Sequence, residues 1–390
     1  MKKVCVITGT RAEYGLLKPL IEKINRDNSL DLKLIATGMH LSPEFGLTYK
    51  VIEEDGYVVD EKIDILLSSD SPTGIAKSMG LALISFGEAF ERMKPDCVIV
   101  LGDRFEIMSV ALATTVFRIP LIHLHGGEIT EGLIDDPIRH SITKQAHLHF
   151  TSTEKYRKRV IQLGEEPKRV FNVGAIGIEN IVKMKLLSRE ELEESLNFKL
   201  EGRYALCTFH PVTLENNTSE KQFKELLEAF DELSDLKVIF TKANADTEGR
   251  VINRLIEEYV NANGCRAIAF ASLGQLKYLT AMKYCDFVIG NSSSGIIETP
   301  TFGVPAINIG DRQKGRIKAK NVIDCKPEKS EIMDAINEAL SQTFNNSIKD
   351  IQNPYGDGEV SDKMLTIIKC FLNKDVSLKK SFYDMNDSTT

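Results

Sequence analysis

Short runs of apolar residues recur along the chain and alternate with longer segments in which apolar and polar residues follow a helical period. Uninterrupted apolar runs are typical of parallel strands that are covered on both faces. In the first half of the chain, the runs that predict strands are 4–8, 32–37, 97–102, 120–125, 148–152 and 170–174. The segments that predict helices are 14–25, 74–92, 104–117, 137–146 and 154–163. This alternation predicts a doubly wound α/β domain.

The alternation stops at 183–203, where charged residues predict one or two helices and no strand. It then resumes, with predicted strands at 204–210, 237–242, 267–272, 285–291 and 304–310 and predicted helices at 219–233, 248–263, 274–283 and 328–342. We therefore predict two Rossmann-like domains, residues 1–182 and 183–358, with the active site in the cleft between them. Residues 359–390 are predicted to form a last helix that packs back on the first domain, followed by a polar, frayed tail.

Composition narrows the class of protein. The chain has 390 residues, of which 42% are hydrophobic and 27% charged, as expected for a globular protein of two domains. A net charge of −7 argues against nucleic acid as the main partner. The seven cysteines are scattered and form no CxxC pair, which is typical of reduced thiols. No apolar stretch approaches the length of a membrane span or signal peptide, so we predict a soluble, cytoplasmic protein with no membrane partner.

The segment TGTRAEYG (8–15) follows the first predicted strand. Its small residues permit close backbone approach, and Arg11 and the N-terminus of the next helix can bind a phosphate group. The segment is not GxGxxG and no acidic residue closes the second strand, so we expect neither a nicotinamide nor a flavin cofactor. The alternative interpretation is a strand–helix turn with an exposed arginine.

The segment LGDRFE (101–106) follows another buried strand and brings Asp103 and Arg104 to its carboxyl end, where catalytic groups are commonly found. The alternative is that Asp103 is only the N-cap of the helix that follows.

The segment HLHGGEITEGLIDDPIRH, which begins at His123, combines histidines with several carboxylates. On an extended strand His123 and His125 would point to the same face. Glu128 and Asp135 follow in the loop, and Asp136 suits the N-cap of the next helix. Histidines and carboxylates can bind zinc, but HxH alone is a weak metal signal. We therefore favour acid–base chemistry and predict no metal.

The segment GNSSSGIIETP (290–300) follows a predicted strand of the second domain and opens a helix. The N–H groups and hydroxyls of Ser292, Ser293, Ser294 and Gly295 can bind phosphate oxygens. Glu298, about one turn further on, can accept hydrogen bonds from ribose hydroxyls. The alternative is a serine-rich N-cap, although a cap needs only one serine.

Two further loops of the second domain carry basic or imidazole groups. His210 lies in FHPVTLEN, directly after a strand, and five basic residues lie between Arg312 and Lys320. Such a cluster gives an acidic protein a local positive field that suits a diphosphate. The alternatives are a loop histidine without a role and a solvated basic loop. Together the segments predict an enzyme that acts on a nucleotide sugar through carboxylates, without a redox cofactor.

In this order, the motifs resemble those of the hydrolysing UDP-N-acetylglucosamine 2-epimerases of sialic-acid biosynthesis. The motifs that carry the resemblance are TGTRAEYG, ATGMHLSPEFG, LGDRFE, HLHGGE, IDDPIRHSITKQAHLHF, HPVT, GNSSSGIIE, INIGDRQKGR and YGDG. The resemblance implies the two-domain, GT-B-like fold that many glycosyltransferases share. It also implies conversion of UDP-N-acetylglucosamine and water to N-acetylmannosamine and UDP. That reaction proceeds by anti elimination to a glycal and hydration with inversion at C2, and it needs no cofactor.

The resemblance also assigns roles to residues of this chain. Asp103 and Asp135 match catalytic carboxylates, and Glu298 matches the residue that binds the ribose. The residues that match nucleotide, phosphate or substrate contacts are Arg11, Arg104, His210, Ser292, Ser293 and Arg312. Many members have glutamate in place of His125, and that glutamate has an acid–base role. In this chain either His125 or Glu128 takes the role, and an imidazole is chemically able to do so.

Several alternatives remain at this point. Some relatives act on UDP-N,N′-diacetylbacillosamine in legionaminic acid synthesis by the same chemistry. A GT-B glycosyltransferase, a metal-dependent hydrolase built on His123, His125 and Asp135, and a non-catalytic UDP-sugar sensor are further possibilities. Members of the family are commonly dimers, so we expect a homodimer.

Overall fold

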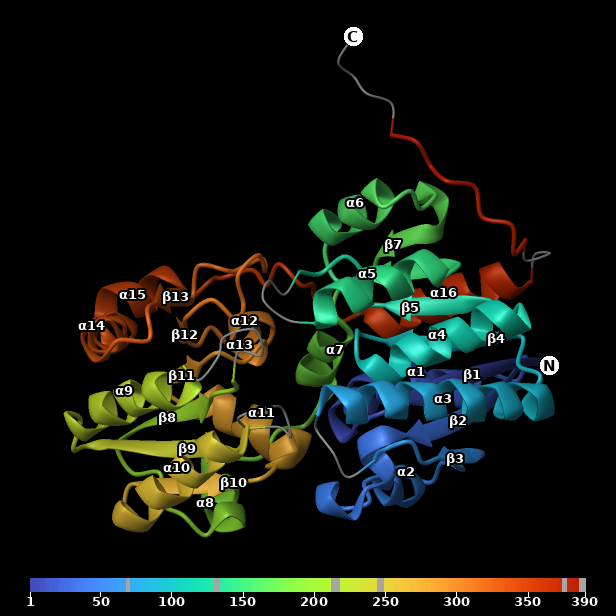
Figure 1. Ribbon diagram of the computed structural model, residues 1–390. Coiled ribbons are helices and arrows are strands. Elements are labelled where there is room, and N and C mark those ends of the chain that lie inside the picture. Colours follow the sequence, from blue (N-terminus) through green and yellow to red (C-terminus); the bar gives the residue numbers. More distant parts are fainter. Residues whose placement is uncertain (68–70, 130–133, 212–217, 244–248, 374–376, 386–390) are drawn as a thin grey trace. The chain divides into compact units, whose positions relative to one another are not determined.

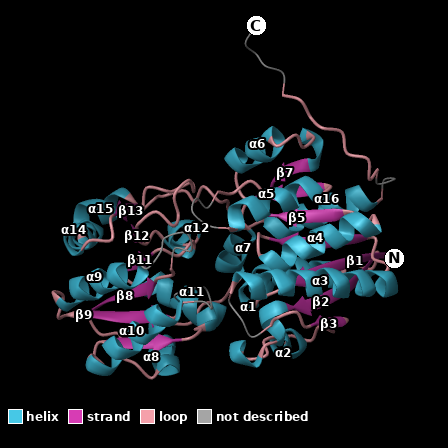
Figure 2. Ribbon diagram, in the orientation of Figure 1, coloured by secondary structure: helices cyan, strands magenta, loops and turns pink. Residues whose placement is uncertain are grey.

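The computed structural model describes residues 1–67, 71–129, 134–211, 218–243, 249–373 and 377–385 (Figure 1). The chain divides into two compact units. Unit 1 comprises Met1–Glu128, Asp135–Asn180 and Tyr355–Thr390, and unit 2 comprises Ile129–Ile134 and Ile181–Pro354. Each unit is an α/β sandwich with helices on its sheet (Figure 2).

The sheet of unit 1 has the order β3-β2-β1-β4-β5-β6-β7, and every neighbouring pair is parallel. Its strands are β1 Lys2–Thr8, β2 Leu30–Thr37, β3 Glu61–Ile63, β4 Cys97–Leu101, β5 Leu121–Leu124, β6 Leu148–Thr151 and β7 Val170–Asn172. The central strands are apolar on both sides because both faces of the sheet are covered by helices.

The helices of unit 1 form two cores, one on each face of its sheet. The helices are α1 Arg11–Arg26, α2 Tyr49–Glu54, α3 Pro72–Met93, α4 Phe105–Phe117, α5 Asp135–Gln145, α6 Glu154–Gln162, α7 Ile176–Lys183 and α16 Val360–Leu372, with short 3₁₀ turns η1 Gly38–Leu41, η2 Pro43–Phe45 and η3 Pro167–Arg169. Helices α1, α2 and α16 pack on one face, and α3, α4 and α5 pack on the other.

Helix α16 belongs to unit 1 although it follows unit 2 in the sequence. Met364 and Ile368 are fully buried in the same core as Leu17 and Leu20 of α1. The buried carboxylate of Glu179 accepts hydrogen bonds from the N–H and the hydroxyl of Ser361, both at 2.6 Å. A negative charge at a helix N-terminus is stabilising, so this contact fixes the start of α16.

The polar tail after α16 was expected to fray, and the described part of it does not. The Lys380 ammonium donates to the carbonyl of Ala146 at 2.5 Å and pairs with the buried carboxylate of Glu165 at 2.7 Å. The N–H of Tyr383 donates to the carbonyl of Gly164 at 2.9 Å. These contacts offset the loss of chain entropy that favours fraying.

The sheet of unit 2 has the order β10-β9-β8-β11-β12-β13 and is also parallel throughout. Its strands are β8 Arg203–Thr208, β9 Leu236–Thr241, β10 Ala267–Phe270, β11 Phe287–Gly290, β12 Ala306–Ile309 and β13 Val322–Cys325. Its helices are α8 Arg189–Leu196, α9 Ser219–Asp231, α10 Gly249–Ala262, α11 Gly274–Tyr284, α12 Ser294–Ile297, α13 Thr299–Phe302, α14 Lys329–Leu340 and α15 Gln342–Ser347. One core involves α9, α10 and α14, and the other involves α8 and α11.

The predicted doubly wound architecture is confirmed in both units. The main predicted strands and helices are present, with ends that differ by a few residues. The strands β3 and β13 were not predicted because they lie at sheet edges and contain charged residues, so no continuous apolar run marks them. Among the described residues, no helix combines the length and apolar character needed to cross a membrane.

Candidate active site

Each sheet reverses its strand order at one place, between β1 and β4 in unit 1 and between β8 and β11 in unit 2. Open parallel sheets bind ligands beyond the carboxyl ends of the strands at such a place. The segments TGTRAEYG and LGDRFE follow β1 and β4, while FHPVTLEN and GNSSSGIIETP follow β8 and β11. Topology therefore places four of the predicted motifs at the two switch points.

Asp103 is held by an arginine and does not cap a helix. Helix α4 starts at Phe105 with Arg104 in the N-cap position, and no side chain makes the capping bond. The Asp103 carboxylate instead pairs with the guanidinium of Arg139, which is only 3% exposed and also donates to the carbonyl of Glu128 at 2.9 Å. The N-cap interpretation of Asp103 is therefore wrong, and Arg139 is a site residue that the sequence analysis missed.

His123 is a buried structural residue of β5. One ring nitrogen, Nε2, lies 2.7 Å from the carbonyl oxygen of Gly102, and the other lies 3.2 Å from the hydroxyl of Thr143. Burial lowers the pKa of His123 to about 3, so the ring is neutral, and Nε2–H donates to the carbonyl. This bond fixes the residue directly before Asp103.

The two histidines of HLHGGE do not share a face, in contrast to the prediction. Strand β5 ends at Leu124, and His125 has a left-handed φ of 65°. This turn takes His125 out of the extended geometry that would align it with His123. Among the described residues, no group of three or more histidine, cysteine, aspartate or glutamate side chains could hold a metal ion.

His125 and Glu128 form a pair. The Nδ1 atom of His125 lies 3.2 Å from Oε1 of Glu128, and the hydroxyl of Ser152 donates to the same oxygen at 2.9 Å. The Nε2 atom of His125 is buried and has no hydrogen-bond partner among the described residues. Gly127 permits this tight turn, because a Cβ there would lie 2.5 Å from the carbonyl oxygen of Tyr156. A left-handed conformation at a histidine stores strain of a kind often found at functional sites.

The two adjacent aspartates lie in the first turn of α5. The helix begins at Asp135, two residues before the predicted start, and both side chains are partly exposed. Asp136 lies 3.5 Å from Arg139 and 3.6 Å from Nε2 of His140. Negative charge here complements the helix dipole. Residues 130–133, between Glu128 and this helix, lie outside the described part of the chain.

The arginines of unit 1 differ in their surroundings. Arg11 is exposed at the first position of α1, after the N-cap Thr10. Arg104 is half-buried and donates from Nε to Oε1 of Glu106 at 2.7 Å. Both side chains come from loops at the switch point of the sheet, which is the position predicted for an anion-binding arginine.

In unit 2, Asn291 connects three predicted motifs. Its side chain accepts the N–H of His210 and donates to the carbonyl of the same residue, both at 2.7 Å. Its carbonyl accepts from Arg312 at 3.1 Å and from Gln313 at 2.8 Å. Asn291 was not predicted, although it stands in the quoted GNSSSG motif. It brings His210 and Arg312 to the serine loop.

Gly290 and His210 have specific constraints. Gly290 has a φ of 134°, and an added Cβ would lie 1.9 Å from the carbonyl oxygen of Thr208, so only glycine fits. Burial, with the nearby Arg312 charge, lowers the pKa of His210 to about 3, so its imidazole is neutral. Residues 212–217 of the His210 segment lie outside the described residues.

The serine loop forms a hydroxyl cluster. Oγ of Ser294 lies 3.1 Å from Oγ of Ser292 and 2.5 Å from the Tyr278 hydroxyl. The side chain of the N-cap residue Ser293 makes no capping bond, although the hydroxyl of Ser292 accepts the N–H of Ser294 at 3.4 Å. Glu298 stands between the short helices α12 and α13, not within one continuous helix as predicted. Burial raises the pKa of Glu298 to about 7, so the carboxyl group is partly protonated at neutral pH.

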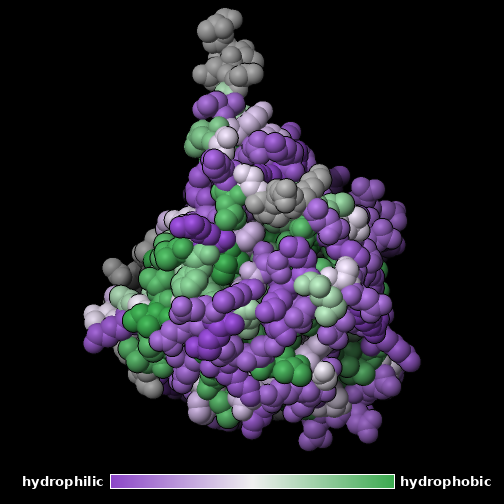
Figure 3. All heavy atoms as spheres, turned by 90° about the vertical axis from the view of Figure 1, so that its right-hand side faces the viewer, coloured by the Kyte–Doolittle hydropathy of each residue, from purple (hydrophilic) through white to green (hydrophobic). Residues whose placement is uncertain are grey.

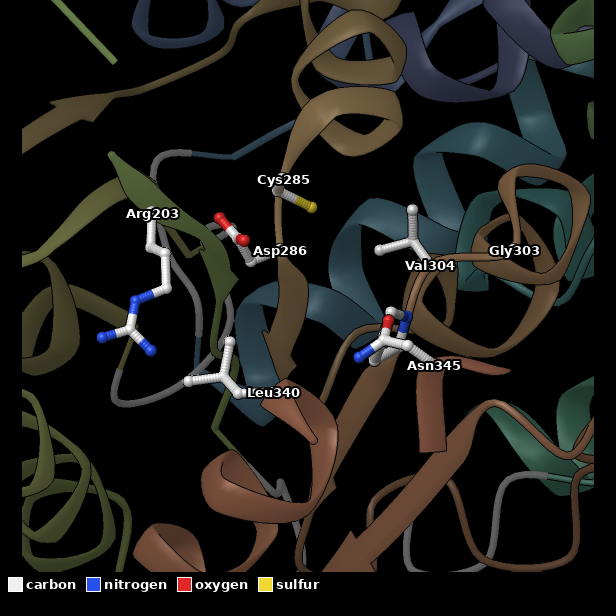
Figure 4. Close-up of a pocket in the computed structure, with 8 residues that line it drawn as sticks. Arg203, Cys285, Asp286, Gly303, Val304, Leu340 and Asn345 are labelled. Carbon is white, nitrogen blue, oxygen red and sulfur yellow. The ribbon is translucent and has the colours of Figure 1, made fainter. Parts of the chain in front are cut away.

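A pocket of about 340 Å³ in unit 2 lies away from these loops (Figure 4). Arg203, Asp286 and Pro305, which line it, stand at the amino ends of β8, β11 and β12. Ligands of parallel sheets bind at the opposite, carboxyl ends. We therefore assign the site from the motif residues and not from this pocket.

Comparison with known proteins identifies the family of this chain. The family model for UDP-N-acetylglucosamine 2-epimerase matches residues 22–369. This chain belongs to that family.

Two relatives match this chain over almost its whole length and support its membership of the family. The chain is 47% identical, over 98% of its length and 99% of the relative, to a hydrolysing GDP/UDP-N,N′-diacetylbacillosamine 2-epimerase of Campylobacter jejuni. It is 41% identical, over 100% of its length and 99% of the relative, to polysialic acid biosynthesis protein P7 of Escherichia coli. The predicted resemblance to the hydrolysing UDP-N-acetylglucosamine 2-epimerase family is thus confirmed.

A solved structure of the epimerase family has the same fold. The UDP-N-acetylglucosamine 2-epimerase of Neisseria meningitidis, bound to UDP-N-acetylglucosamine, matches with a TM-score of 0.79 at 18% identity, covering 95% of this chain and 100% of the other. At that identity the likeness concerns the fold. The predicted GT-B-like fold class is confirmed, and the fold positions the residues described above in two doubly wound units.

Proposed function

We propose that this protein is a hydrolysing UDP-sugar 2-epimerase that cleaves its substrate by anti elimination and hydration. A base removes the proton at C2 while UDP leaves C1, which gives a glycal. Water then adds at C1, and a proton returns to the opposite face of C2. The cluster of Asp103, Arg139, His125 and Glu128 carries the proposal, because this reaction needs proton-transfer groups close together.

We assign the proton transfers to Asp103, Asp135 and the His125–Glu128 pair. Glu128 pairs with the Nδ1 side of the His125 ring, which leaves Nε2 as the atom that exchanges a proton with the sugar. This arrangement unites the two interpretations of the sequence: His125 carries the proton, and Glu128 orients the ring. The Arg139 guanidinium favours the ionised form of Asp103, which suits a base.

The C2 proton is weakly acidic, so stabilising the departing UDP dominates the barrier. We propose that Ser292, Ser293, Ser294, Gly295, His210 and Arg312 bind the nucleotide and its phosphates. Glu298 would bind the ribose, and its raised pKa lets the carboxyl group donate as well as accept hydrogen bonds. Arg11 and Arg104 would contact the phosphates or the sugar.

His125→Gln tests the assignment of the proton carrier. Glutamine retains a hydrogen-bonding group but cannot exchange a proton, so we expect turnover to fall by about 10²–10⁴-fold with little change in UDP affinity. The matched control is His147→Gln, a histidine at the start of β6 that is remote from the motif loops. A His125→Gln enzyme that keeps a near-normal rate would move the role to Glu128.

Two substrates fit the proposal. UDP-N-acetylglucosamine is implied by the family, and UDP-N,N′-diacetylbacillosamine is named for the Campylobacter relative at 47% identity. They differ at carbons 4 and 6 of the sugar. Turnover of both, measured as UDP release at equal concentrations, distinguishes them: the true substrate has the higher kcat/KM. If neither releases UDP without an added acceptor, the hydrolysing function is wrong and a GT-B glycosyltransferase becomes the better assignment.

We further propose that the protein acts as a homodimer in the cytoplasm. Apolar side chains gather on part of the surface seen in Figure 3. On α3 and α4, the exposed apolar side chains are Leu81, Leu83, Ile84, Leu112, Val116 and Phe117. Such exposed apolar groups are typical of interaction surfaces. All seven cysteines are free thiols, which suits a reducing compartment.

Light scattering on the intact protein and on Ile84→Glu tests the homodimer. We expect a dimer for the wild type and a monomer for the variant, because Ile84 is 64% exposed and a charge there opposes apolar contact. A monomeric wild type at micromolar concentration would contradict this part of the proposal.

A further inference from the structure

Two buried carboxyl groups lie beneath the loops that follow β1 and β4 and have no part in the mechanism above. Glu13 in the first turn of α1 is 7% exposed, and Glu106 in the first turn of α4 is 1% exposed. Glutamate is rarely buried to this degree unless it is paired. The two helices follow β1 and β4, which are neighbouring central strands at the switch point of the sheet.

Their contacts tie them to both loops. The N–H of Gly9 donates to Oε2 of Glu13 at 2.7 Å, and Nε of Arg104 donates to Oε1 of Glu106 at 2.7 Å. A Cβ added to Gly9 would lie 2.6 Å from Oε1 of Glu106, so the Glu106 carboxyl group also lies against the first loop. Both carboxyl groups therefore support the segments that carry Arg11 and Arg104.

The charges around the pair do not balance if both glutamates are ionised. Arg104 is the cation that contacts Glu106, and Oε2 of Glu106 is buried without a hydrogen-bond partner among the described residues. Burial and the charge of Glu106 raise the pKa of Glu13 to about 7, although Arg104 and the N–H of Gly9 oppose the shift. Like charges near each other disfavour ionisation, so Glu13 keeps its proton to a higher pH than an isolated glutamate does.

Two other titratable groups near these loops, His40 and Arg11, do not supply the missing positive charge. His40, on the loop after β2, has its ring nitrogens 3.1 Å from the Thr8 hydroxyl and 2.9 Å from the Thr48 hydroxyl. Burial lowers the pKa of His40 to about 4, so the ring is neutral at physiological pH. Arg11 is exposed to solvent, which screens its charge.

We propose that Glu13 and Glu106 hold one proton between them, and that this proton keeps the loops carrying Arg11 and Arg104 competent to bind an anionic substrate. With the proton present, Arg104 and the two carboxyl groups sum to zero charge. Without it they sum to −1, and the extra negative charge repels a diphosphate. Glu13 is thus a positioning residue, and its effect on substrate binding rests on the proposed function.

The pH dependence has a defined sign. Below about pH 7 the proton is present and KM is low, whereas above it the proton is lost and KM rises. A unit charge about 10 Å from a phosphate, at an effective dielectric constant of about 20, changes affinity roughly tenfold. The pair does not touch the reacting atoms, so kcat changes less than KM.

The proton also affects stability, whether or not the protein is an epimerase. The pKa of Glu13 is about 7 in the folded protein and 4.5 in the reference state. A carboxyl group with a raised folded pKa binds more protons in the folded state, so stability falls as pH rises from about 4.5 to about 7. Replacing Glu13 by glutamine, which resembles the protonated group, removes this fall.

The experiment compares wild type, Glu13→Gln and the surface control Glu91→Gln, which changes an exposed glutamate of α3. KM and kcat are measured with the better of the two UDP-sugars between about pH 5.5 and 9, and melting temperature is measured over the same range. In the wild type and in Glu91→Gln, we expect KM to rise as pH increases above about 7. In Glu13→Gln, we expect no such rise. We also expect Glu13→Gln to gain stability relative to wild type as pH rises.

Two results would overturn the proposal: a rise in KM that persists in Glu13→Gln, or a stability difference from wild type that does not vary with pH. If Glu13→Gln does not fold, Glu106→Gln removes the other half of the pair and should also lack the rise in KM. If the wild type turns over neither sugar, the proposed function fails, and the stability measurement alone decides whether the proton is shared.

Discussion

The contact between Asp103 and Arg139 gives a prediction that can be worked out from the structure. Arg139 is 3% exposed, and its guanidinium contacts the carboxylates of Asp103 and Asp136 and the carbonyl of Glu128. Arg139→Gln removes the positive charge and the fork of donors that glutamine cannot reproduce. The Asp103 carboxylate is then left partly buried without its partner.

Removing one partner of a fully buried ion pair costs about 3–5 kcal/mol. The side chain of Asp103 is 21% exposed, so water recovers part of its solvation and we reduce the cost to about 2–3 kcal/mol. For a unit of this size, 1 kcal/mol corresponds to roughly 2–4 °C in melting temperature. Arg139→Gln should therefore lower the melting temperature by about 4–12 °C and, by misplacing Asp103, reduce turnover strongly.

The assay is a double-mutant cycle on stability, with Asp103→Asn, Arg139→Gln and the double variant. We expect a coupling free energy of about 1–3 kcal/mol, because the two residues are in direct contact. The control is Arg92→Gln, which removes an arginine that donates to Glu61 at 3.1 Å but is 57% exposed. An exposed pair contributes less than about 1 kcal/mol. Additive effects in the cycle, or equal losses in Arg139→Gln and Arg92→Gln, would refute the reasoning.

Three further predictions follow from single residues. Gly290→Ala should abolish stable folding or lower the free energy of unfolding by well over about 2 kcal/mol, because a Cβ would lie 1.9 Å from a main-chain oxygen. The control is Gly310→Ala, which is also at positive φ but in open space. It should lower the free energy of unfolding in urea by about 1–2 kcal/mol. Burial raises the pKa of Glu165, but its bonds to a histidine and two lysines outweigh this and lower it to about 2. Glu165→Gln should therefore lose about 3 kcal/mol at pH 7 relative to wild type, a difference that fades between about pH 4.5 and 2 because the wild-type carboxylate is then protonated. Asp103→Asn and Asp135→Asn should each reduce turnover by at least about 10²-fold while calorimetry shows UDP affinity within a few-fold of wild type, and a near-normal rate in either would remove that residue from the mechanism.

The sequence was sufficient to predict the architecture because buried parallel strands have a strong hydrophobic pattern. Parallel strands covered on both sides must be apolar throughout, so runs such as CVIVL stand out, and the alternation with helices leaves few topologies. Edge strands such as β3 are short and half polar, so no continuous apolar run marks them and the sequence did not predict them. The contacts of Lys380 were missed because a polar tail gives no sign of a buried carboxylate elsewhere in the chain.

The candidate site was predicted in part. Four of the motifs follow the strands at the two switch points, and the others follow the neighbouring strands β5 and β12. Arg139 and Asn291 were missed as site residues because an arginine in a helix and an asparagine in a loop acquire their roles only from what they contact. The separation of His123 from His125 depends on a single left-handed residue, which strand periodicity cannot reveal.

The central claim is that this epimerase-family protein cleaves a UDP-sugar by elimination and rehydration. The most direct measurement is to incubate the protein with UDP-N-acetylglucosamine and, separately, UDP-N,N′-diacetylbacillosamine in deuterated water and to analyse the products by NMR. We expect free UDP and a sugar inverted at C2 that carries deuterium at that carbon. Free UDP with a product that retains hydrogen at C2, or no UDP from either substrate, would contradict it.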